Sequence, residues 1–441
     1  MDSDRSPLYR LRLLLVYRDV LRNKVLPLTR LYARRFARCQ QRAASSLQHK
    51  EKLHVAFLLS TPGMWKCHYL YKEMEQNPRY HPFLVLLPYS MYKGYSHAQV
   101  EAMLERTRLF AERQGYDYVI PRDMHTGKWD DIRSTLKPDI VFFSSPYKDV
   151  YPQYYIYHFR DTLTCYVPYA FSSLKAYKNN YDLIFHNLVG LYLLEIDWHR
   201  QAAADNARCG ARNAVVSGYP GTEVFLRGDY NPRDRWKPQP LPMKRVVWAP
   251  HHPVDDPTGV ATFLTYCHFM LRLANKYSQS VQFAFKPHQL LRFKLSKLWG
   301  ELRTAEYYDT WNRLPNGQLE ESEYIDLFLT SDALIHDSGS FTTEYLFMRK
   351  PVMYLLPGQQ AAERFNTFGL QAFHCHYHGQ SEADIDRFVS NTVLGGDDPL
   401  AGIRNAFYGK YLAPNGGSLP SRNIIQIIER KIHTPYSQHE S

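Results

Sequence analysis

One segment, 333–356, constrains the fold of this chain more than any other. Ala333 to Ile335 is a short apolar run, as expected for a buried parallel strand. The polar residues Asp337 to Ser340 end that strand, and a helix is predicted from about Phe341 to Arg349 before a second apolar strand. Strand, polar turn, helix and strand form a βαβ unit. Its turn is expected at the carboxyl edge of a parallel sheet, where ligands bind.

The turn of this unit carries groups suited to a phosphorylated ligand. Backbone N–H groups at Ser338, Gly339 and Ser340, together with the helix dipole, favour a phosphate. Asp337 and Glu344 add two carboxylates that can hold sugar hydroxyls. A structural interpretation, in which Ser340 caps the helix, is the alternative. Glu344 lies one residue beyond capping-box spacing from Ser340, so its carboxylate needs another partner or open solvent.

The rest of the chain from Leu53 repeats the alternation of strands and helices. Strands are predicted in a first series at 53–60, 82–87, 117–120, 138–143, 164–168 and 183–185, with helices at 64–76 and 98–114. A second series has strands at 246–249 and 281–285 and a helix at 260–276, ahead of the unit at 333–356. Such alternation is typical of parallel α/β sheets.

The domain organisation follows from these two series. Residues 221–243, with four prolines among charges, are interpreted as a linker. We therefore predict an α/β fold of two Rossmann-like, doubly wound domains facing a cleft, at 53–220 and 244–441. The last predicted helix, Ser421 to Lys431, is expected to cross back onto the first domain.

The first 52 residues carry most of the net charge. They contain 13 Lys/Arg and four Asp/Glu, a net of +9 out of +11 for the whole chain. Apolar residues recur at helical spacing from Leu11 to Tyr32, with arginines between them. A basic amphipathic helix of this kind is typical of a segment on an anionic membrane surface. Packing on the protein or a partner is the alternative. Nucleic-acid binding is disfavoured, because the segment lacks aromatic platforms for bases.

Composition disfavours an integral membrane protein and a secreted one. No run approaches the roughly 18 apolar residues of a membrane span. Arg10, Arg12 and Arg18 interrupt the only candidate for a signal peptide. The six cysteines form no CxxC pair, which fits a reducing cytoplasm better than a disulfide framework.

Histidines follow two strands of the second series. His251 and His252 come directly after strand 246–249, and Lys286 and His288 come after strand 281–285. Imidazole holds a pyrophosphate when protonated and accepts a proton when neutral. We predict His251, His252 and His288 as catalytic residues, and Lys286 as a residue that offsets diphosphate charge.

The segment SDALIHDSGSFTTEYLFMRKPVMYL resembles the D-Y-S-S-x-x-x-[DE]-Y…K-P signature of the CDP-glycerol glycerophosphotransferase family, whose members build teichoic acids and related capsular polymers of bacteria. Three further segments follow the family's order. Residues 215–220 resemble its G-x-P, residues 245–253 its strand-ending A-P motif, and residues 285–288 its R/K-x-H-P motif. The resemblance covers most of residues 53–431.

This resemblance implies an activity. A GT-B enzyme would transfer an alditol phosphate, glycerol phosphate first of all, from a CDP-alditol donor to a polymer or lipid-linked acceptor, with CMP leaving. Lys286, Asp337, Ser338, Gly339, Ser340 and Glu344 would bind the donor. Neither a metal nor another cofactor is implied. The protein would be cytoplasmic, peripheral on the inner face of the bacterial plasma membrane.

The sequence departs from the family where the family's base is assigned. The family motif W-H-G-T-P corresponds to Cys165 to Phe171, with Tyr169 in place of the histidine. Tyrosine, with a reference pKa of about 10, is a poor base at neutral pH. Three explanations stay open: the substrate differs, the chain is inactive, or the base is another histidine, namely His251, His252 or His186. Tyr169 and Trp65, the latter after the first strand, are predicted on the acceptor side.

Other functions were weighed on the same residues. His374, His376 and His378 alternate along a predicted strand with spacing that can bind a transition metal, but no second set of ligands accompanies them, so no metal site is predicted. The alternatives to the phosphotransferase are a GT-B glycosyltransferase that uses a nucleotide sugar, a non-catalytic membrane-surface protein and an epimerase of similar fold.

Overall fold

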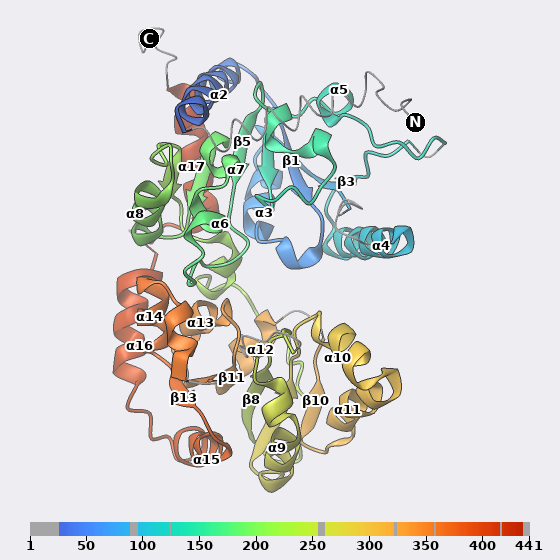
Figure 1. Cartoon of the computed structure of the whole chain (residues 1–441), viewed down its shortest axis with the longest axis vertical. Coiled ribbons are helices and arrows are strands. Elements are labelled where there is room, and N and C mark those ends of the chain that lie inside the picture. Colours follow the sequence, from blue (N-terminus) through green and yellow to red (C-terminus); the bar gives the residue numbers. More distant parts are fainter. Residues whose placement is uncertain are drawn as a thin grey trace, which may run out of the picture. The chain divides into compact units, whose positions relative to one another are not determined.

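The chain forms two compact units of α/β structure (Figure 1). The computed structural model describes residues 26–88, 96–123, 125–254, 261–321, 324–356, 359–414 and 417–434. Unit 1 comprises Met1–Ala170, Ala176–Glu223 and Pro414–Ser441; unit 2 comprises Phe171–Lys175 and Val224–Ala413.

Unit 1 is built on a seven-stranded parallel sheet in the order β3-β2-β1-β4-β5-β6-β7. The strands are β1 Leu53–Leu59, β2 Tyr80–Leu86, β3 Tyr118–Val119, β4 Ile140–Phe143, β5 Leu163–Tyr166, β6 Leu191–Leu194 and β7 Ala214–Val216. Its α-helices are α2 Leu26–Ser46, α3 His68–Gln76, α4 His97–Gln114, α5 Ile132–Thr135, α6 Tyr177–Tyr181, α7 Ile184–Leu188, α8 Asp197–Asn206 and α17 Pro420–His433. β1, β4, β5 and β6 are almost wholly buried, as expected for strands covered on both faces.

Unit 2 is built on a six-stranded parallel sheet in the order β10-β9-β8-β11-β12-β13. The strands are β8 Lys244–Ala249, β9 Val281–Phe285, β10 Gly317–Leu319, β11 Ala333–His336, β12 Val352–Leu355 and β13 Tyr377–Gly379. Its α-helices are α9 Phe263–Lys276, α10 Leu291–Trp299, α11 Glu301–Arg313, α12 Ile325–Thr330, α13 Phe341–Glu344, α14 Thr367–Phe373, α15 Glu382–Arg387 and α16 Ala401–Phe407. Stacked Trp248, Phe285 and Trp311 lie at the centre of its core.

Each sheet reverses its direction of growth once. In unit 1 the chain runs outward from β1 to β3 and then starts again beside β1 with β4; in unit 2 it does the same from β8 to β10 and then with β11. Because crossovers between parallel strands are right-handed, a reversal puts the later helices on the opposite face. Both units are therefore doubly wound, and the carboxyl ends of β1/β4 and of β8/β11 are the ligand-binding switch points of such sheets. The predicted pair of Rossmann-like domains is confirmed.

One predicted strand is wrong. Leu183 to Phe185 does not form a strand: helix α7 begins at Ile184, and the Leu183 N–H is accepted by His186 Nδ1 at 3.2 Å. The strand of this region is β6, Leu191–Leu194. Three apolar residues fit either element, and the local hydrogen bond to His186 decides for the helix.

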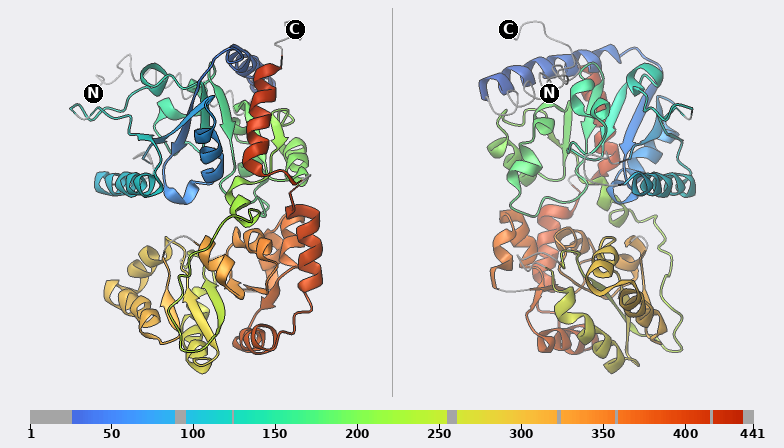
Figure 2. Two further views of the ribbon diagram at one scale, coloured as in Figure 1. Left: turned by 180° about the vertical axis from the view of Figure 1, so that it is seen from behind. Right: turned by 45° about the vertical axis from the view of Figure 1, so that its right-hand side comes forward.

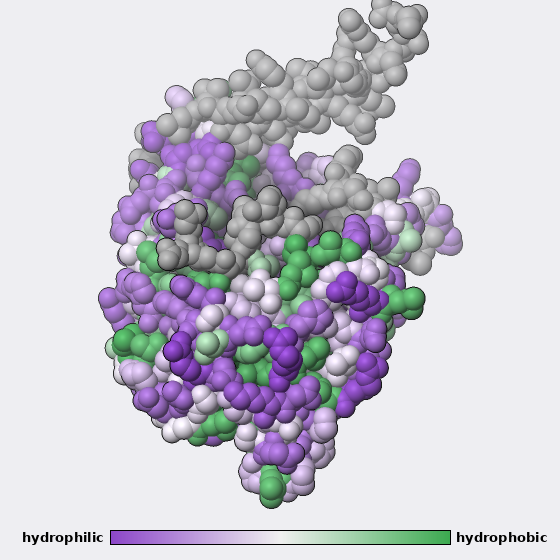
Figure 3. Space-filling model, turned by 60° about the horizontal axis from the view of Figure 1, so that its bottom comes forward, coloured by the Kyte–Doolittle hydropathy of each residue, from purple (hydrophilic) through white to green (hydrophobic). Residues whose placement is uncertain are grey.

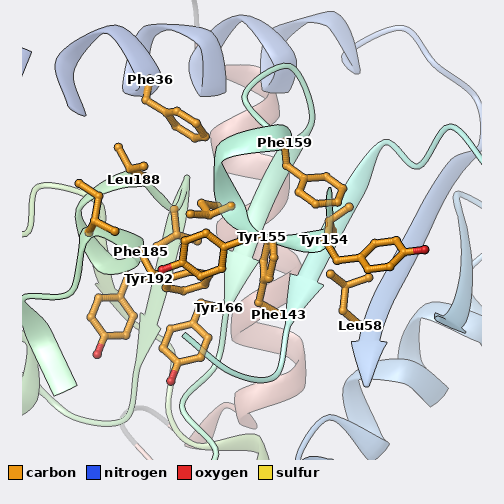
Figure 4. Packing of buried hydrophobic residues seen from close by; sticks show 14 of the residues in the cluster. Phe36, Leu58, Phe143, Tyr154, Tyr155, Phe159, Tyr166, Phe185, Leu188 and Tyr192 are labelled. Atoms are coloured by element: carbon orange, nitrogen blue, oxygen red, sulfur yellow. The ribbon is translucent and has the colours of Figure 1, made fainter. Parts of the chain in front are cut away.

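Helix α2 lies against its own unit, beside α17, and also packs on α7 and β5 (Figure 2). Phe36 projects from α2 toward buried aromatic residues of unit 1, among them Phe159 and Phe185 (Figure 4). Gln40 is buried; its Nε2 donates to the carbonyls of residues 159, 160 and 162, and its Oε1 accepts from both Thr164 N and Oγ1 at 2.7–2.8 Å. The face of α2 that carries Phe36 and Gln40 is therefore covered by protein, whereas Leu28 and Leu31 of the same helix are exposed.

The opposite face of α2 is basic. Arg30, Arg34, Arg35, Arg38 and Arg42 are exposed on it. The predicted apolar stripe from Leu11 to Val25 lies outside the described residues. Within the described part of the chain, no helix combines the length and hydropathy needed to cross a bilayer.

The last helix, α17, belongs to unit 1 and packs on α2 and α3. Its first turn is fixed by Glu223, whose carboxylate accepts from both Ser421 N and Ser421 Oγ at 2.7 Å. All three groups are buried, so the end of the chain is fastened to the segment that leaves unit 1 at Glu223.

Candidate functional site

Three histidines gather at the carboxyl ends of β8 and β9. The ring centroids of His251 and His252 are 4.5 Å apart, those of His252 and His288 4.3 Å, and those of His251 and His288 5.0 Å. The loops are joined by main-chain bonds, since Lys286 N donates to Trp248 O and His288 N donates to Pro250 O. The sequence prediction that these rings share one edge of a sheet agrees with this geometry.

Asp337 holds the histidine loop in place. The side chain is fully buried; Oδ1 accepts the N–H of His251 at 2.6 Å, and Oδ2 accepts Thr262 N at 2.7 Å and Thr262 Oγ1 at 2.9 Å. Burial raises the pKa of this carboxyl, while the three donors oppose that shift. Asp337 stays a predicted donor-binding residue. In the structure its buried carboxylate joins the loop after β11 to the loop after β8.

The surroundings of the histidines are cationic. Burial, followed by the other two imidazoles, lowers the pKa of His251 to about 3, and the charges of Arg364 and Lys294 add to the shift. Burial and then His252 lower the pKa of His288 to about 4, with further contributions from Lys286 and Lys294. Both imidazoles are therefore neutral at pH 7, and Lys286, Lys294 and Arg364 supply the positive charge near them.

This charge distribution favours an anion over a metal ion. The three histidines can each offer a ligand atom within 4.8 Å of the others, and they are the sole such group found in the described ranges. A divalent cation would meet the field of Lys286, Lys294 and Arg364. In addition, His288 Nδ1 already accepts the N–H of Leu290 at 3.1 Å. A diphosphate gains from both the cations and the imidazole N–H groups.

The turn after β11 is held largely by the protein itself. Ser338 N donates to His336 Nδ1 at 3.1 Å, and the hydroxyls of Ser338 and Ser340 are 3.2 Å apart. Ser340 makes no side-chain cap, and α13 is only four residues long before it tightens into a 3-10 helix at Tyr345–Met348. The predicted helix over 341–349 is therefore present over 341–348, but only its first four residues are α-helical, so its dipole contributes little.

Two neighbours complete this turn within unit 2. Leu174 lies against Gly339, and Ser173 Oγ is 2.9 Å from Thr343 Oγ1. Glu344 is buried, and its Oε2 accepts the hydroxyl of Tyr324 at 2.5 Å. Glu344 is too far from Ser340 in sequence to form a capping box, and Tyr324, 20 residues earlier, is its hydrogen-bond partner instead. Ser338, Gly339, Ser340 and Glu344 stay predicted donor-binding residues.

The carboxyl edge of unit 1 carries the two residues predicted on the acceptor side. Trp65 follows β1 and is half-buried; its indole N–H donates to Tyr116 Oη at 3.0 Å, so only its ring face can meet a ligand. Tyr169 follows β5 and is half-buried. His186, considered as a base, is buried among Tyr166, Phe185 and Tyr192, and burial lowers its pKa to about 3. It is not placed to meet a substrate.

The histidines between 374 and 378 do not form a metal site. His374 caps α14, His376 is buried with Nδ1 2.9 Å from Ala372 O, and His378 stacks on Phe373 at 4.0 Å between ring centroids. They do not share one strand face, because β13 begins only at Tyr377. The three histidines alternate in sequence only because the end of helix α14 is followed closely by the short strand β13.

Lys294 and Arg364 were missed by sequence reasoning. Lys294 lies on the second turn of the helix after His288, and Arg364 ends a 3-10 helix at Gln359–Arg364, beyond β12. Neither directly follows a strand. Lys294 is six residues after His288, a spacing that would have placed it near the histidine had α10 been predicted.

Comparisons with known proteins support the fold. No family model and no curated protein matches the sequence. Among solved structures, the wall teichoic acid polymerase TagF, as its H444N variant, matches with a TM-score of 0.55 at 11% identity over 96% of each chain. MnaA of S. aureus, in a co-structure with UDP, has a TM-score of 0.55 at 13% identity over 87% of this chain and 98% of that one.

A third match is the UDP-GlcNAc 2-epimerase of Neisseria meningitidis bound to UDP-GlcNAc, with a TM-score of 0.51 at 13% identity over 86% of this chain and 100% of that one. At such identities the likeness concerns the fold. The chain has a GT-B-like fold of two Rossmann-like domains.

Proposed function

We propose that this protein transfers an alditol phosphate, glycerol phosphate in the first instance, from a CDP-activated donor to the hydroxyl of a polymer or lipid-linked acceptor. The observation that carries the proposal is the cluster of His251, His252 and His288 at the β8/β11 switch point, with cationic residues beside it. A nucleotide diphosphate would bring the negative charge that balances these cations. The resemblance of residues 331–355 to the phosphotransferase signature favours CDP-glycerol as that nucleotide.

The reaction would be a displacement at phosphorus. The acceptor oxygen attacks the β-phosphorus of the CDP-alditol, the bond from that phosphorus to the bridging oxygen breaks, and CMP carries the bridging oxygen away. Lys286, Lys294 and Arg364 would balance charge on the phosphoryl oxygens. A neutral imidazole would take the proton of the acceptor hydroxyl.

His251 is our first candidate for that base. Its Nδ1 is buried and has no hydrogen-bond partner among the described residues, so Nε2 would be the ring atom that accepts the proton of the acceptor hydroxyl. A pKa of about 3 makes it a weak base in the free protein, but a bound diphosphate would raise that pKa. His252 and His288 would then position phosphate oxygens.

Transfer from a nucleotide sugar is the second candidate function. It is favoured by the solved structures of similar fold whose ligands are UDP and UDP-GlcNAc, and by Tyr169 at the place of the family's histidine. The cationic cluster would hold a UDP-sugar equally well. A transferase would release UDP, whereas an epimerase would release no nucleotide as product.

Product analysis decides between the two. The protein is incubated with CDP-glycerol or UDP-GlcNAc and membranes that supply acceptors, and released CMP and UDP are quantified by chromatography. We expect CMP from CDP-glycerol, and its loss in a Lys286→Ala/Arg364→Ala variant but not in Arg272→Ala, an exposed arginine of the same unit. Release of UDP without CMP would replace the first function by the second.

We also propose that residues 1–52 hold the protein on the inner face of the plasma membrane. Because Phe36 and Gln40 of α2 are buried in unit 1, α2 would act through its exposed arginines, at about 1 kcal/mol for each arginine near an anionic surface, together with the exposed Leu28 and Leu31. Replacing Arg34, Arg35 and Arg38 by Glu should weaken sedimentation with anionic vesicles at low salt and leave the fold intact. Undiminished binding would show that α2 takes no part.

A further inference from the structure

A second surface, on α10 and α11 of unit 2, combines exposed apolar and basic side chains. Four large apolar residues within 13 positions are strongly exposed: Leu290 (45%), Phe293 (51%), Leu298 (55%) and Leu302 (89%). Ten large hydrophobic residues of the described chain are exposed to this degree, so this short stretch holds a large share of them. We call these four residues and the cations between them the α10–α11 ridge.

The cations of the ridge are Arg292, Lys294, Lys297 and Arg303. Lys297 Nζ lies 4.2 Å from the ring centroid of Phe293, and the Arg303 guanidinium lies 4.7 Å from that of the half-buried Trp299. Glu301 is the one acidic residue between 289 and 303, which leaves a net charge of +3. The apolar groups thus stand among cations rather than among groups of mixed sign.

The fold does not need the exposed residues. The two helices are held to unit 2 by other side chains, all buried: Leu291 and Leu295 of α10, and Thr304, Tyr307, Tyr308 and Trp311 of α11. The exposed residues belong to the N-cap of α10, to α10 and to the first turn of α11, two helices that pack on each other. Figure 3 shows that one face of the molecule carries hydrophobic residues in separate groups within a mainly hydrophilic surface. An exposed apolar cluster flanked by charge marks an interaction site.

We propose that the α10–α11 ridge inserts into the interfacial layer of an anionic lipid bilayer. Leucine and phenylalanine would enter the boundary between headgroups and acyl chains, while the Lys and Arg side chains extend to lipid phosphates. This site is separate from α2, lies on the other unit and uses hydrophobic contact as well as charge. It goes beyond the proposed transfer reaction and does not depend on which nucleotide the protein uses.

Charge favours a bilayer over a second copy of the chain. A symmetric dimer built on the ridge would bring a net +3 against a net +3, and like charges across an interface are repulsive. An anionic membrane offers both the opposite charge and an apolar layer. Arg292 also pairs with Glu321 at 3.3 Å, but within the described residues neither Lys297 nor Arg303 forms an ion pair that competes with phosphate.

Lys294 links the ridge to the candidate site. It adds to the lowering of the pKa of both His251 and His288, and it precedes the exposed Lys297 and Leu298 on the same helix. Docking of the ridge would therefore bring the histidine cluster close to the headgroup layer, where a lipid-linked acceptor ends.

The test uses the full chain. It is mixed with vesicles of phosphatidylcholine alone or with vesicles in which roughly a third of the lipid is the anionic phosphatidylglycerol. The variant Phe293→Glu/Leu298→Glu is compared with Leu241→Glu/Ile403→Glu, whose parent residues are exposed to 67% and 49% in the same unit. We expect the ridge variant to lose at least about tenfold in partition coefficient on anionic vesicles, because it loses apolar insertion and its net charge falls from +3 to +1. The control pair should bind as the wild type. Equal binding of all three proteins would overturn the proposal.

A fluorescent label locates the contact independently of α2. An environment-sensitive dye is attached at Leu302→Cys or, as control, at Leu241→Cys, in a chain with Cys39 and Cys209 replaced by Ser, since the other four cysteines are buried. Anionic vesicles should shift the emission at 302 to the blue and leave that at 241 unchanged. A shift at 302 that appears without vesicles and grows with protein concentration would identify a second copy as the occupant and overturn the bilayer.

Discussion

The two switch points share one topology and carry opposite chemistry. In unit 2 the loop after β11 is tied to the loop after β8 by the Asp337 carboxylate, which accepts the N–H of His251. In unit 1 the loop after β4 is tied to β1 by a neutral hydroxyl, as Ser144 Oγ donates to Leu58 O at 2.7 Å. Histidines and cations surround the bond of Asp337 in unit 2. The bond of Ser144 in unit 1 has hydroxyl and carboxyl groups near it in sequence, such as Ser145, whose hydroxyl lies 3.2 Å from Asp149.

The difference shows what the fold determines and what the loops determine. A doubly wound sheet brings two loops together at each reversal, whatever their sequence. The loops then give unit 2 the histidines and cations at which we propose an anion site, and give unit 1 hydroxyl and aromatic groups. In unit 1, the buried carboxylate of Glu195 lies 2.9 Å from the imidazole of His199, whereas the Asp337 carboxylate of unit 2 bonds the main chain of His251 and not its ring.

The largest expected effect concerns Asp337 and Ser144, the side chains that join the loops at the two switch points. Asp337→Ala should destabilise the protein by about 3–5 kcal/mol, since it leaves the buried Thr262 N–H and the His251 N–H without acceptors. Ser144→Ala should cost only about 0.5–1.5 kcal/mol, the net value of one hydrogen bond. Urea unfolding measures both, with Asp337→Asn as the isosteric variant. Equal costs at the two positions would remove this part of the contrast.

The second prediction separates the histidines of unit 2 from the tyrosine of unit 1. His251→Ala should lower turnover by about 100-fold, as expected when a general base or an electrostatic contact is lost. Tyr169→Phe should lower it less than about tenfold, because the ring and its packing are kept. Steady-state rates on the accepted nucleotide measure both. An inactive Tyr169→Phe beside an active His251→Ala would move the base to unit 1.

The third and smallest effect is the pH dependence that His251 and His288 of unit 2 contribute. The pKa of His251 is about 3 and that of His288 about 4, both below the ordinary 6.5. The unfolded chain therefore binds more protons below pH 6.5, so the stability contributed by these groups is present above pH 6.5 and is lost as the pH falls toward 4.

A bound diphosphate should reverse that shift. Because it raises both pKa values, binding should take up protons, and affinity should improve by at most about tenfold per pH unit for each proton between pH 7.5 and 6. Calorimetry in buffers of different ionisation enthalpy measures the uptake. Binding without proton uptake would mean that the nucleotide does not contact the histidines.

Much of the fold could be predicted, because strands such as β1, β4, β8 and β11 are short apolar runs bounded by polar turns. The failure at Leu183 to Phe185 has a local cause: the deciding contact is the side chain of His186 on a backbone N–H. The burial of one face of α2 depends on Gln40 meeting carbonyls about 120 residues away, which no local pattern reveals.

The candidate site could be predicted in part. Residues that directly follow strands, namely His251, His252, Lys286 and His288, were found because parallel strands end at one edge. The bonds that Asp337 makes could not be predicted, since its partner Thr262 lies 75 residues earlier and only the folded chain brings the two together. Lys294 and Arg364 reach the site from a helix and a 3-10 turn, where strand ends give no guide.

Nucleotide binding by the histidine cluster is the central claim, and isothermal titration tests it most directly. CDP-glycerol, CDP-ribitol, UDP-GlcNAc and GDP-mannose are each titrated into the wild type, Lys286→Ala/Arg364→Ala and the Arg272→Ala control. We predict that CDP-glycerol binds tightest, that the double variant loses at least about 100-fold in affinity through two charge-assisted contacts, and that the control loses none. Equal affinity of the wild type and the double variant for every nucleotide would contradict the account.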